Sequence, residues 1–185
     1  MRKALFLDRD GVVNRDFGYV GHFTDFEFMP GIFELVLHYQ KKGFLPVIVT
    51  NQSGIARGYY SEADFHTLMK QVMKEFNKHG ISTFPVYYCP HHQEGIVARY
   101  ALSCKCRKPE AGMFLSAAKE HEIDISQSIM VGDSWRDILA ADIAGVRKSF
   151  FLSAATPNQK ESAQLHQAHH VTRAETLADL LNLAS

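Results

Sequence analysis

Three features that would each define a class of protein are missing from this sequence. No apolar run approaches the roughly 18–20 residues needed to cross a bilayer. The apolar run after Met1 is too short for a secretory signal peptide. Lys and Arg together number 20, as do Asp and Glu, so no net charge attracts the chain to nucleic acid or to a membrane surface. We therefore expect a cytoplasmic protein with no nucleic-acid or membrane partner.

Cysteine is scarce as well, with only Cys89, Cys104 and Cys106. An odd number does not fit the disulfide framework of a small secreted fold. Thiols in a reducing compartment are the better interpretation, and their clustering suggests a metal site.

The chain does contain a regular alternation of short apolar runs and longer amphipathic segments. Its length fits one domain spanning residues 1–185, and 46% hydrophobic residues are enough for an ordinary core. Strands are expected at residues 4–7, 46–50, 86–88, 128–131 and 148–152, and helices at residues 31–42, 61–78, 109–122, 135–144 and 173–183. Polar residues 156–163 are expected to form a loop that leads into a helix. The alternation predicts an α/β fold with a mostly parallel sheet and helices on both faces.

Polar side chains follow three of the predicted strands. Asp8 and Asp10 follow the first strand, Thr50 ends the second, and Asp133 follows the fourth. Ligands bind outside the carboxyl ends of strands in open α/β sheets, so these side chains should face one crevice. Clustered carboxylates repel one another unless a cation lies between them, and oxygen ligands favour Mg²⁺. Each feature alone also fits an ordinary turn, but their order along the chain indicates a shared function.

This arrangement of carboxylates suits phosphoryl transfer. One carboxylate can act as the nucleophile and form an aspartyl-phosphate. A second carboxyl group two residues further on can protonate the leaving oxygen and then activate the water that hydrolyses the intermediate. The metal reduces the repulsion between the nucleophile and the phosphate. The pattern therefore predicts a magnesium-dependent phosphatase.

The cysteines predict a second metal site. Cys89 and His91 form one short pair, and Cys104 and Cys106 form another after an irregular loop. Three thiolates and an imidazole match a tetrahedral structural zinc site, with His92 as the alternative imidazole. Four protein ligands leave no open position, which argues against a catalytic zinc.

This zinc loop, residues 89–106, leads directly into two cations. Arg107 and Lys108 follow Cys106 without a spacer. We hypothesise that zinc fixes the backbone here and so positions Lys108 on the phosphate and Arg107 on the substrate.

Four runs of residues resemble the four motifs of the haloacid dehalogenase superfamily of phosphatases. They are Asp8-Arg9-Asp10-Gly11-Val12-Val13-Asn14, Val49-Thr50-Asn51-Gln52-Ser53-Gly54, Lys108-Pro109 and Val131-Gly132-Asp133-Ser134-x-x-Asp137. The resemblance implies a three-layer Rossmann-like fold. It implies Asp8 as nucleophile, Asp10 as general acid and base, and Mg²⁺ on the Asp8 side chain, the Asp10 backbone carbonyl and Asp133.

The same resemblance implies a set of phosphate contacts. Thr50 and Lys108 would hold the transferring phosphoryl group, with Asn51 nearby. Asp137 would support these groups rather than bind the metal directly.

Within the superfamily, three segments look like those of the D-glycero-D-manno-heptose-1,7-bisphosphate phosphatases. They are Cys-Pro-His-His with a long loop to Cys-x-Cys-Arg-Lys-Pro, Asp16-Phe17-Gly18-Tyr19-Val20, and Thr50-Asn51-Gln52-Ser53-Gly54-Ile55-Ala56-Arg57-Gly58. The match runs from about Leu5 to Val146. It implies a chain without a large cap domain that removes the C7 phosphate of the heptose bisphosphate.

In such an enzyme, loops would contact the sugar and its retained C1 phosphate. The residues implied are Asp16, Phe17, Gly18, Tyr19, Thr50, Asn51, Gln52, Ser53, Arg107, Lys108 and Ser134. One departure concerns Ser134, because members of the family often carry Lys at this position. The missing cation would alter phosphate or anomer preference.

Other interpretations remain at this point. Histidinol-phosphate phosphatases share the aspartate motifs and the zinc loop, although their loop is usually shorter. A zinc-containing binding module without catalysis is a second alternative, and the small basic cluster around Arg107 is a weak argument for nucleic-acid binding. We expect a monomer acting on a small sugar phosphate. No motif predicts the anomer preference or a role for the residues after 150.

Overall fold

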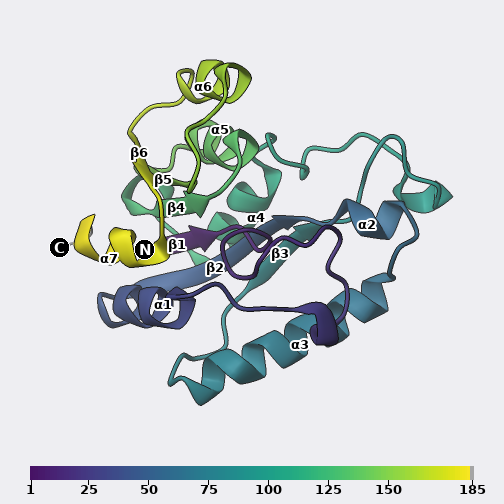
Figure 1. Ribbon diagram of the computed structural model, residues 1–185, viewed down its shortest axis with the longest axis horizontal. Helices are drawn as coiled ribbons and strands as arrows, with labels where there is room; N and C mark the ends of the chain where they lie inside the picture. Colours follow the sequence, from purple (N-terminus) through teal and green to yellow (C-terminus); the bar gives the residue numbers. More distant parts are fainter. Residues whose placement is uncertain (184–185) are drawn as a thin grey trace.

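The computed structural model describes residues 1–183, and a single parallel sheet forms its centre (Figure 1). The strands lie in the order β3-β2-β1-β4-β5-β6. Their bounds are β1 (Lys3–Leu7), β2 (Phe44–Asn51), β3 (Val86–Cys89), β4 (Ile129–Gly132), β5 (Lys148–Leu152) and β6 (Val171–Ala174). All five pairings are parallel, so every strand ends at the same edge of the sheet. The predicted α/β fold is confirmed.

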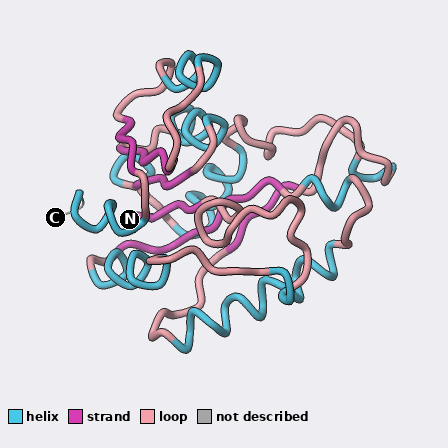
Figure 2. Tube along the Cα trace, in the orientation of Figure 1, coloured by secondary structure: helices cyan, strands magenta, loops and turns pink. Residues whose placement is uncertain are grey.

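Helices cover both faces of the sheet, as Figure 2 shows by colour. On one face lie α1 (Ile32–Lys41), α3 (Glu62–Lys78) and α7 (Leu177–Leu183), and on the other lie α4 (Gly112–His121) and α5 (Trp135–Ala144). Two short helices, α2 (Ser53–Ala56) and α6 (Gln159–Leu165), complete the chain, and α6 packs on α5. Within residues 1–183 no large cap domain is inserted over the strand ends.

Four consecutive residues of the central strand β1 are apolar because both faces of the strand are buried. Leu5 and Leu7 of β1 contribute to the core beneath α1 and α3, whereas Ala4 and Phe6 contribute to the core beneath α4 and α5. Successive side chains of a strand point to opposite faces, so a strand covered on both sides is mostly apolar.

The single helix predicted over residues 173–183 is wrong. Val171–Ala174 forms the edge strand β6, and α7 begins only at Leu177. A reciprocal pair of hydrogen bonds starts the helix: Asp179 N donates to Thr176 Oγ1 at 3.2 Å, and Thr176 N donates to Asp179 Oδ2 at 3.0 Å. This capping box separates strand from helix.

The helix predicted from Pro109 also begins later, at Gly112. The preceding backbone is held as a turn, because Glu110 N donates to Arg107 O at 2.9 Å and Gly112 N donates to Lys105 O at 2.9 Å. The peptide bond between Lys108 and Pro109 is cis. This turn presents Lys108 to the strand ends.

In the described part of the chain, none of the helices combines the length and apolar character that crossing a membrane requires.

Candidate active site

Two of the three carboxylates expected at strand ends, Asp8 and Asp133, lie side by side. Asp8 follows β1 and Asp133 follows β4, and these strands are paired so that Leu7 lies opposite Val131. Asp8 N donates to Val131 O at 3.1 Å, which extends this pairing by one residue. Carboxylate oxygens of Asp8, Asp133 and Asp137 all lie within 4.8 Å of one another.

Gly11 allows Asp133 to reach this position. Its φ of +92° lies in the region that favours glycine, and a Cβ there would lie less than 3.0 Å from the Asp133 carboxylate. The turn after Asp10 therefore needs glycine for both its conformation and its close packing.

Burial makes this carboxylate cluster electrostatically unfavourable. Burial raises the pKa of Asp8, and the charge of Asp137 raises it further, although Lys108 acts in the opposite direction. Burial also raises the pKa of Asp133, and the neighbouring Asp8 adds to the effect. A divalent cation among the oxygens would favour their charged forms, and an all-oxygen donor set suits Mg²⁺.

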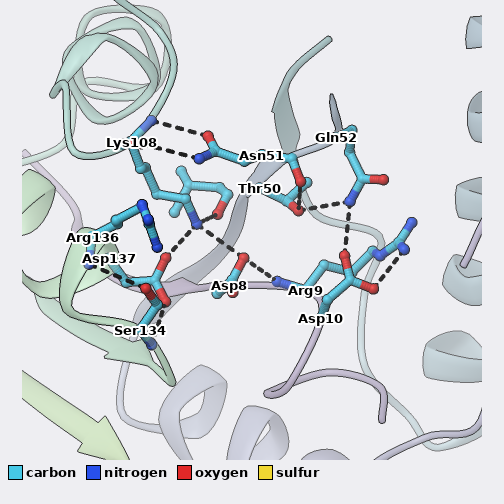
Figure 3. Close-up of polar contacts among 11 residues, drawn as sticks. Asp8, Arg9, Asp10, Thr50, Asn51, Gln52, Lys108, Ser134, Arg136 and Asp137 are labelled. Carbon is cyan, nitrogen blue, oxygen red and sulfur yellow. Dashed lines mark hydrogen bonds and ion pairs between the residues drawn. The ribbon is translucent and has the colours of Figure 1, made fainter. Parts of the chain in front are cut away.

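Lys108 provides a cation within the cluster (Figure 3). Its Nζ lies 2.9 Å from Asp8 Oδ1 and 2.6 Å from Asp137 Oδ1, and it donates to Val49 O at 2.8 Å. Burial lowers the pKa of Lys108, but Asp137 and Asp8 outweigh this effect and raise the pKa above its ordinary value. The buried ammonium therefore stays charged.

Two side chains hold Lys108 in place. The Asn51 side-chain amide forms two hydrogen bonds with the Lys108 backbone. Asn51 Nδ2 donates to Lys108 O at 3.1 Å, and Lys108 N donates to Asn51 Oδ1 at 2.9 Å. Asp137 binds Lys108 through Oδ1 and accepts a hydrogen bond from Ser134 N at 3.1 Å through Oδ2. Both oxygens of Asp137 are thus engaged by protein groups.

The Asp10 carboxylate is held at the other side of Asp8. Its Oδ1 accepts from Arg9 Nη2 at 2.7 Å and from Asn14 Nδ2 at 3.0 Å. Its Oδ2 accepts from Gln52 Nε2 at 3.0 Å. The same Gln52 nitrogen donates to Thr50 Oγ1 at 2.8 Å. Thr50 is fully buried beneath the site rather than part of the pocket wall.

A pocket of about 560 Å³ opens above these groups. Most residues predicted to contact substrate line it, namely Asp16, Gly18, Tyr19, Asn51, Gln52, Ser53, Arg107, Lys108 and Ser134. Phe17 does not, since it lies on the outer side of its loop with 62% of its surface exposed. The pocket also has lining residues to which the sequence analysis gave no role, namely Gly54, Arg57, Tyr60 and Arg136. Gly54 and Arg57 lie within the segment that resembles the heptose phosphatases, and that resemblance could have indicated them.

The predicted zinc ligands form a second cluster. Sγ–Sγ distances are 3.4 Å from Cys89 to Cys104, 3.0 Å from Cys89 to Cys106 and 3.2 Å from Cys104 to Cys106. His91 Nδ1 lies 3.4 Å from Cys106 Sγ. Four such atoms within 4.8 Å of one another fit a tetrahedral zinc site. His92 is not part of this cluster, since its Nδ1 accepts from Glu94 N at 3.1 Å and its Nε2 lies 3.2 Å from Arg57 Nη2.

Comparison with known proteins decides the family. The D-glycero-β-D-manno-heptose-1,7-bisphosphate 7-phosphatase of Vibrio cholerae is 44% identical over 164 residues, which cover 89% of this chain and 88% of that protein. This chain belongs to the heptose-1,7-bisphosphate 7-phosphatase family. A protein of Campylobacter jejuni named as the α-anomer phosphatase is 49% identical over 138 residues, which cover 75% of each chain. A family model described as HAD-hydrolase-like matches residues 105–180.

A solved structure agrees with this family assignment. The D,D-heptose 1,7-bisphosphate phosphatase from B. bronchiseptica, complexed with magnesium and phosphate, superposes with a TM-score of 0.82 at 28% identity and covers 99% of both chains. The predicted recognition of a haloacid dehalogenase-type phosphatase is therefore confirmed, and the chain is a phosphoric monoester hydrolase.

Ser134, which departs from the lysine frequent in the heptose phosphatase family, caps α5 here. Its Oγ accepts a hydrogen bond from Arg136 N at 3.2 Å. Arg136 lines the pocket, with its guanidinium 4.6 Å from the centre of the Trp135 ring. A cation thus borders the pocket from position 136 although position 134 is neutral.

Proposed function

We propose that this chain removes the C7 phosphate of D-glycero-D-manno-heptose 1,7-bisphosphate through an aspartyl-phosphate on Asp8. The observation that carries the proposal is the buried contact of Asp8 with Lys108, 2.9 Å apart at the floor of a pocket bordered by arginines. The names of the relatives in both anomeric forms support the substrate class.

The reaction divides into two displacements. In the first, a carboxylate oxygen of Asp8 bonds to phosphorus, the bond from phosphorus to the C7 oxygen breaks, and Asp10 gives its proton to that oxygen. In the second, Asp10 takes a proton from water as the water oxygen attacks phosphorus, and inorganic phosphate leaves. Asp8 is regenerated as a carboxylate.

Lys108 is assigned to the transferring phosphoryl group. The Thr50 hydroxyl, which the sequence motif also assigned to that group, lies buried beneath the pocket and binds Gln52. Asn51 supports Lys108 through its backbone. A preorganised ammonium beside phosphate stabilises the charge that develops in the transition state.

Mg²⁺ would be held by the Asp8 side chain, the Asp10 backbone carbonyl and Asp133. It would supply positive charge that reduces the repulsion between the nucleophile and the phosphate. The raised pKa values of Asp8 and Asp133 and the magnesium bound in the B. bronchiseptica relative support this assignment.

Zinc would be held by Cys89, His91, Cys104 and Cys106 in a structural role. The hydrogen bond from Arg107 N to Cys104 Sγ, at 3.3 Å, supports a link between this site and the substrate contacts. Arg107 is assigned to the retained C1 phosphate.

The sugar itself is assigned to the loop of Asp16, Gly18 and Tyr19 and to Ser53, which border the same pocket. Phe17, outside that pocket, would contact only a substrate that extends over the rim. A monomeric state and a cytoplasmic location remain predictions.

Turnover of synthetic substrates tests the proposal. We expect kcat/KM for heptose 1,7-bisphosphate, in one or both anomers, to exceed that for histidinol phosphate by about 100-fold or more. Asp8→Asn should abolish both activities. Equal rates on the two substrates would leave only a generic phosphatase.

A further inference from the structure

Tyr60 is a buried tyrosine at the edge of the pocket that neither motif nor metal site explains. It lies between α2 and α3 with only 7% of its surface exposed. Its ring packs closely against Gly21 and Gly54, because a Cβ added at either glycine would lie less than 3.0 Å from a Tyr60 atom. Close packing against two backbone segments restricts the position of the ring and hence of the hydroxyl.

The hydroxyl of Tyr60 donates a hydrogen bond to Gln52 Oε1. Burial raises the pKa of this hydroxyl, which keeps its proton available for that bond. Gln52 then donates through Nε2 to Asp10 Oδ2 at 3.0 Å and to Thr50 Oγ1 at 2.8 Å (Figure 3). These contacts form a relay from Tyr60 through Gln52 to Asp10 and Thr50.

The chemistry of the groups sets the direction of this relay. The Tyr60 hydroxyl donates to Gln52 Oε1, so Gln52 presents its carbonyl oxygen to Tyr60 and its NH₂ group to Asp10. Rotation of the amide by half a turn would place its oxygen against the Asp10 carboxyl group. The Tyr60 hydroxyl opposes that rotation because it binds the amide oxygen from the other side.

The two oxygens of Asp10 are held independently. Arg9 and Asn14 donate to Oδ1, whereas Gln52 is the donor to Oδ2. Without Gln52 in its present orientation, the carboxyl group would lose the contact that sets its rotation. Tyr60 thus influences the orientation of Asp10 indirectly, through its hydrogen bond to Gln52.

We propose that Tyr60 is a positioning residue which, through Gln52, orients the Asp10 carboxyl group for protonation of the leaving oxygen. The inference rests on the proposed function, in which Asp10 transfers that proton. It adds a residue outside the motifs to the machinery of the first displacement.

The leaving group provides the test. A sugar alkoxide must be protonated as it leaves, whereas p-nitrophenolate leaves without a proton. A fault in the orientation of Asp10 should therefore slow the first displacement for heptose bisphosphate and spare p-nitrophenyl phosphate. A general structural fault would slow both.

The variant Tyr60→Phe keeps the ring and removes the hydroxyl. We expect its kcat/KM to fall about tenfold for heptose bisphosphate and less than about twofold for p-nitrophenyl phosphate. Tyr59→Phe is the matched control, because Tyr59 is the neighbouring tyrosine with 60% of its surface exposed. That control should leave both activities unchanged.

A second variant, Gln52→Met, removes the amide and keeps the side-chain length. Gln52 borders the pocket and binds Thr50, so this variant is expected to slow both esters, but Tyr60→Phe should add nothing when Gln52 is already Met. Circular dichroism of Tyr60→Phe checks that the variant folds, as expected for a change that keeps the ring. Equal losses on the two esters in Tyr60→Phe, no loss at all in Tyr60→Phe, or additive effects in the double variant would each overturn the inference. Failure of the proposed function is separate, since it would appear in the wild-type protein as an absence of heptose bisphosphate turnover.

Discussion

The two candidate metal centres lie at the same edge of the sheet and are built in opposite ways. The carboxylate centre brings Asp8 and Asp133 together from strands β1 and β4, which are far apart in the sequence, and it opens into the pocket. The thiol centre comes from residues 89–106 alone and presents four protein ligands. Hard oxygen ligands with an open side suit phosphate chemistry, whereas a closed sulfur and nitrogen set suits a structural ion.

The segment Arg107–Lys108 connects the thiol centre to the carboxylate centre. Arg107 N donates to Cys104 Sγ, and the next residue, Lys108, places its Nζ on Asp8. The thiol centre thus fixes the start of a segment whose end lies among the carboxylates. Substitutions in the carboxylate centre and in the thiol centre should therefore have kinetic effects of different size.

The largest effect is expected for Lys108→Met, which leaves Asp8 and Asp137 buried without their cation. We expect kcat to fall by a factor on the order of 10²–10³. The free energy of unfolding should fall by roughly 3–5 kcal/mol, as for other broken buried ion pairs. Steady-state kinetics and urea unfolding measure the two losses. Lys105→Met, an exposed lysine in the thiol loop, is the control, and wild-type kcat in Lys108→Met would contradict the account.

Gly11→Ala should have the next largest effect on kcat/KM. The same substitution at Gly43 separates the effect of backbone strain from that of a clash with Asp133. Gly11 and Gly43 both have positive φ, +92° and +81°, so alanine costs about 1 kcal/mol or more of backbone strain at either position. Only the Cβ at position 11 meets a side chain, that of Asp133, whereas nothing lies within 4 Å at position 43. We expect kcat/KM to fall about 100-fold in Gly11→Ala and to stay near wild type in Gly43→Ala. Similar kinetics in both variants would show that the Asp133 contact is unimportant.

Cys106→Ser tests the thiol centre and should have the smallest kinetic effect. Loss of one ligand should release zinc and loosen the backbone of Arg107, so that kcat/KM falls about tenfold while the protein stays folded. Metal analysis, circular dichroism and kinetics on the same sample measure the three quantities. Ser103→Ala is the control within the same loop. A folded, zinc-free Cys106→Ser with unchanged kinetics would show that the two centres are independent.

The carboxylate centre was predictable from sequence because the carboxyl ends of parallel strands lie at the same edge of a sheet. Once β1, β2 and β4 are recognised as parallel, Asp8, Thr50 and Asp133 must lie at one edge. The thiol centre was predictable for a different reason, since its ligands are close in sequence. In both cases the pattern of residue types alone indicated the chemistry.

Features that depend on side-chain packing were not predictable. The contact of Tyr60 with Gln52 depends on how two glycines approach the ring, which no spacing reveals. Phe17 belongs to the predicted substrate loop, but the turn at Gly18 leaves it outside the pocket. Strand β6 was missed because its four residues run almost directly into the amphipathic segment of α7.

The central claim is that phosphate passes through the carboxylate centre as a covalent intermediate on Asp8. Rapid mixing with heptose bisphosphate, acid quenching and mass spectrometry of the peptide that contains Asp8 test this most directly. The account predicts that the mass of one phosphoryl group appears on Asp8 within the first turnover and disappears when substrate is exhausted. Turnover at the normal rate with Asp8 unmodified at every time point would contradict it.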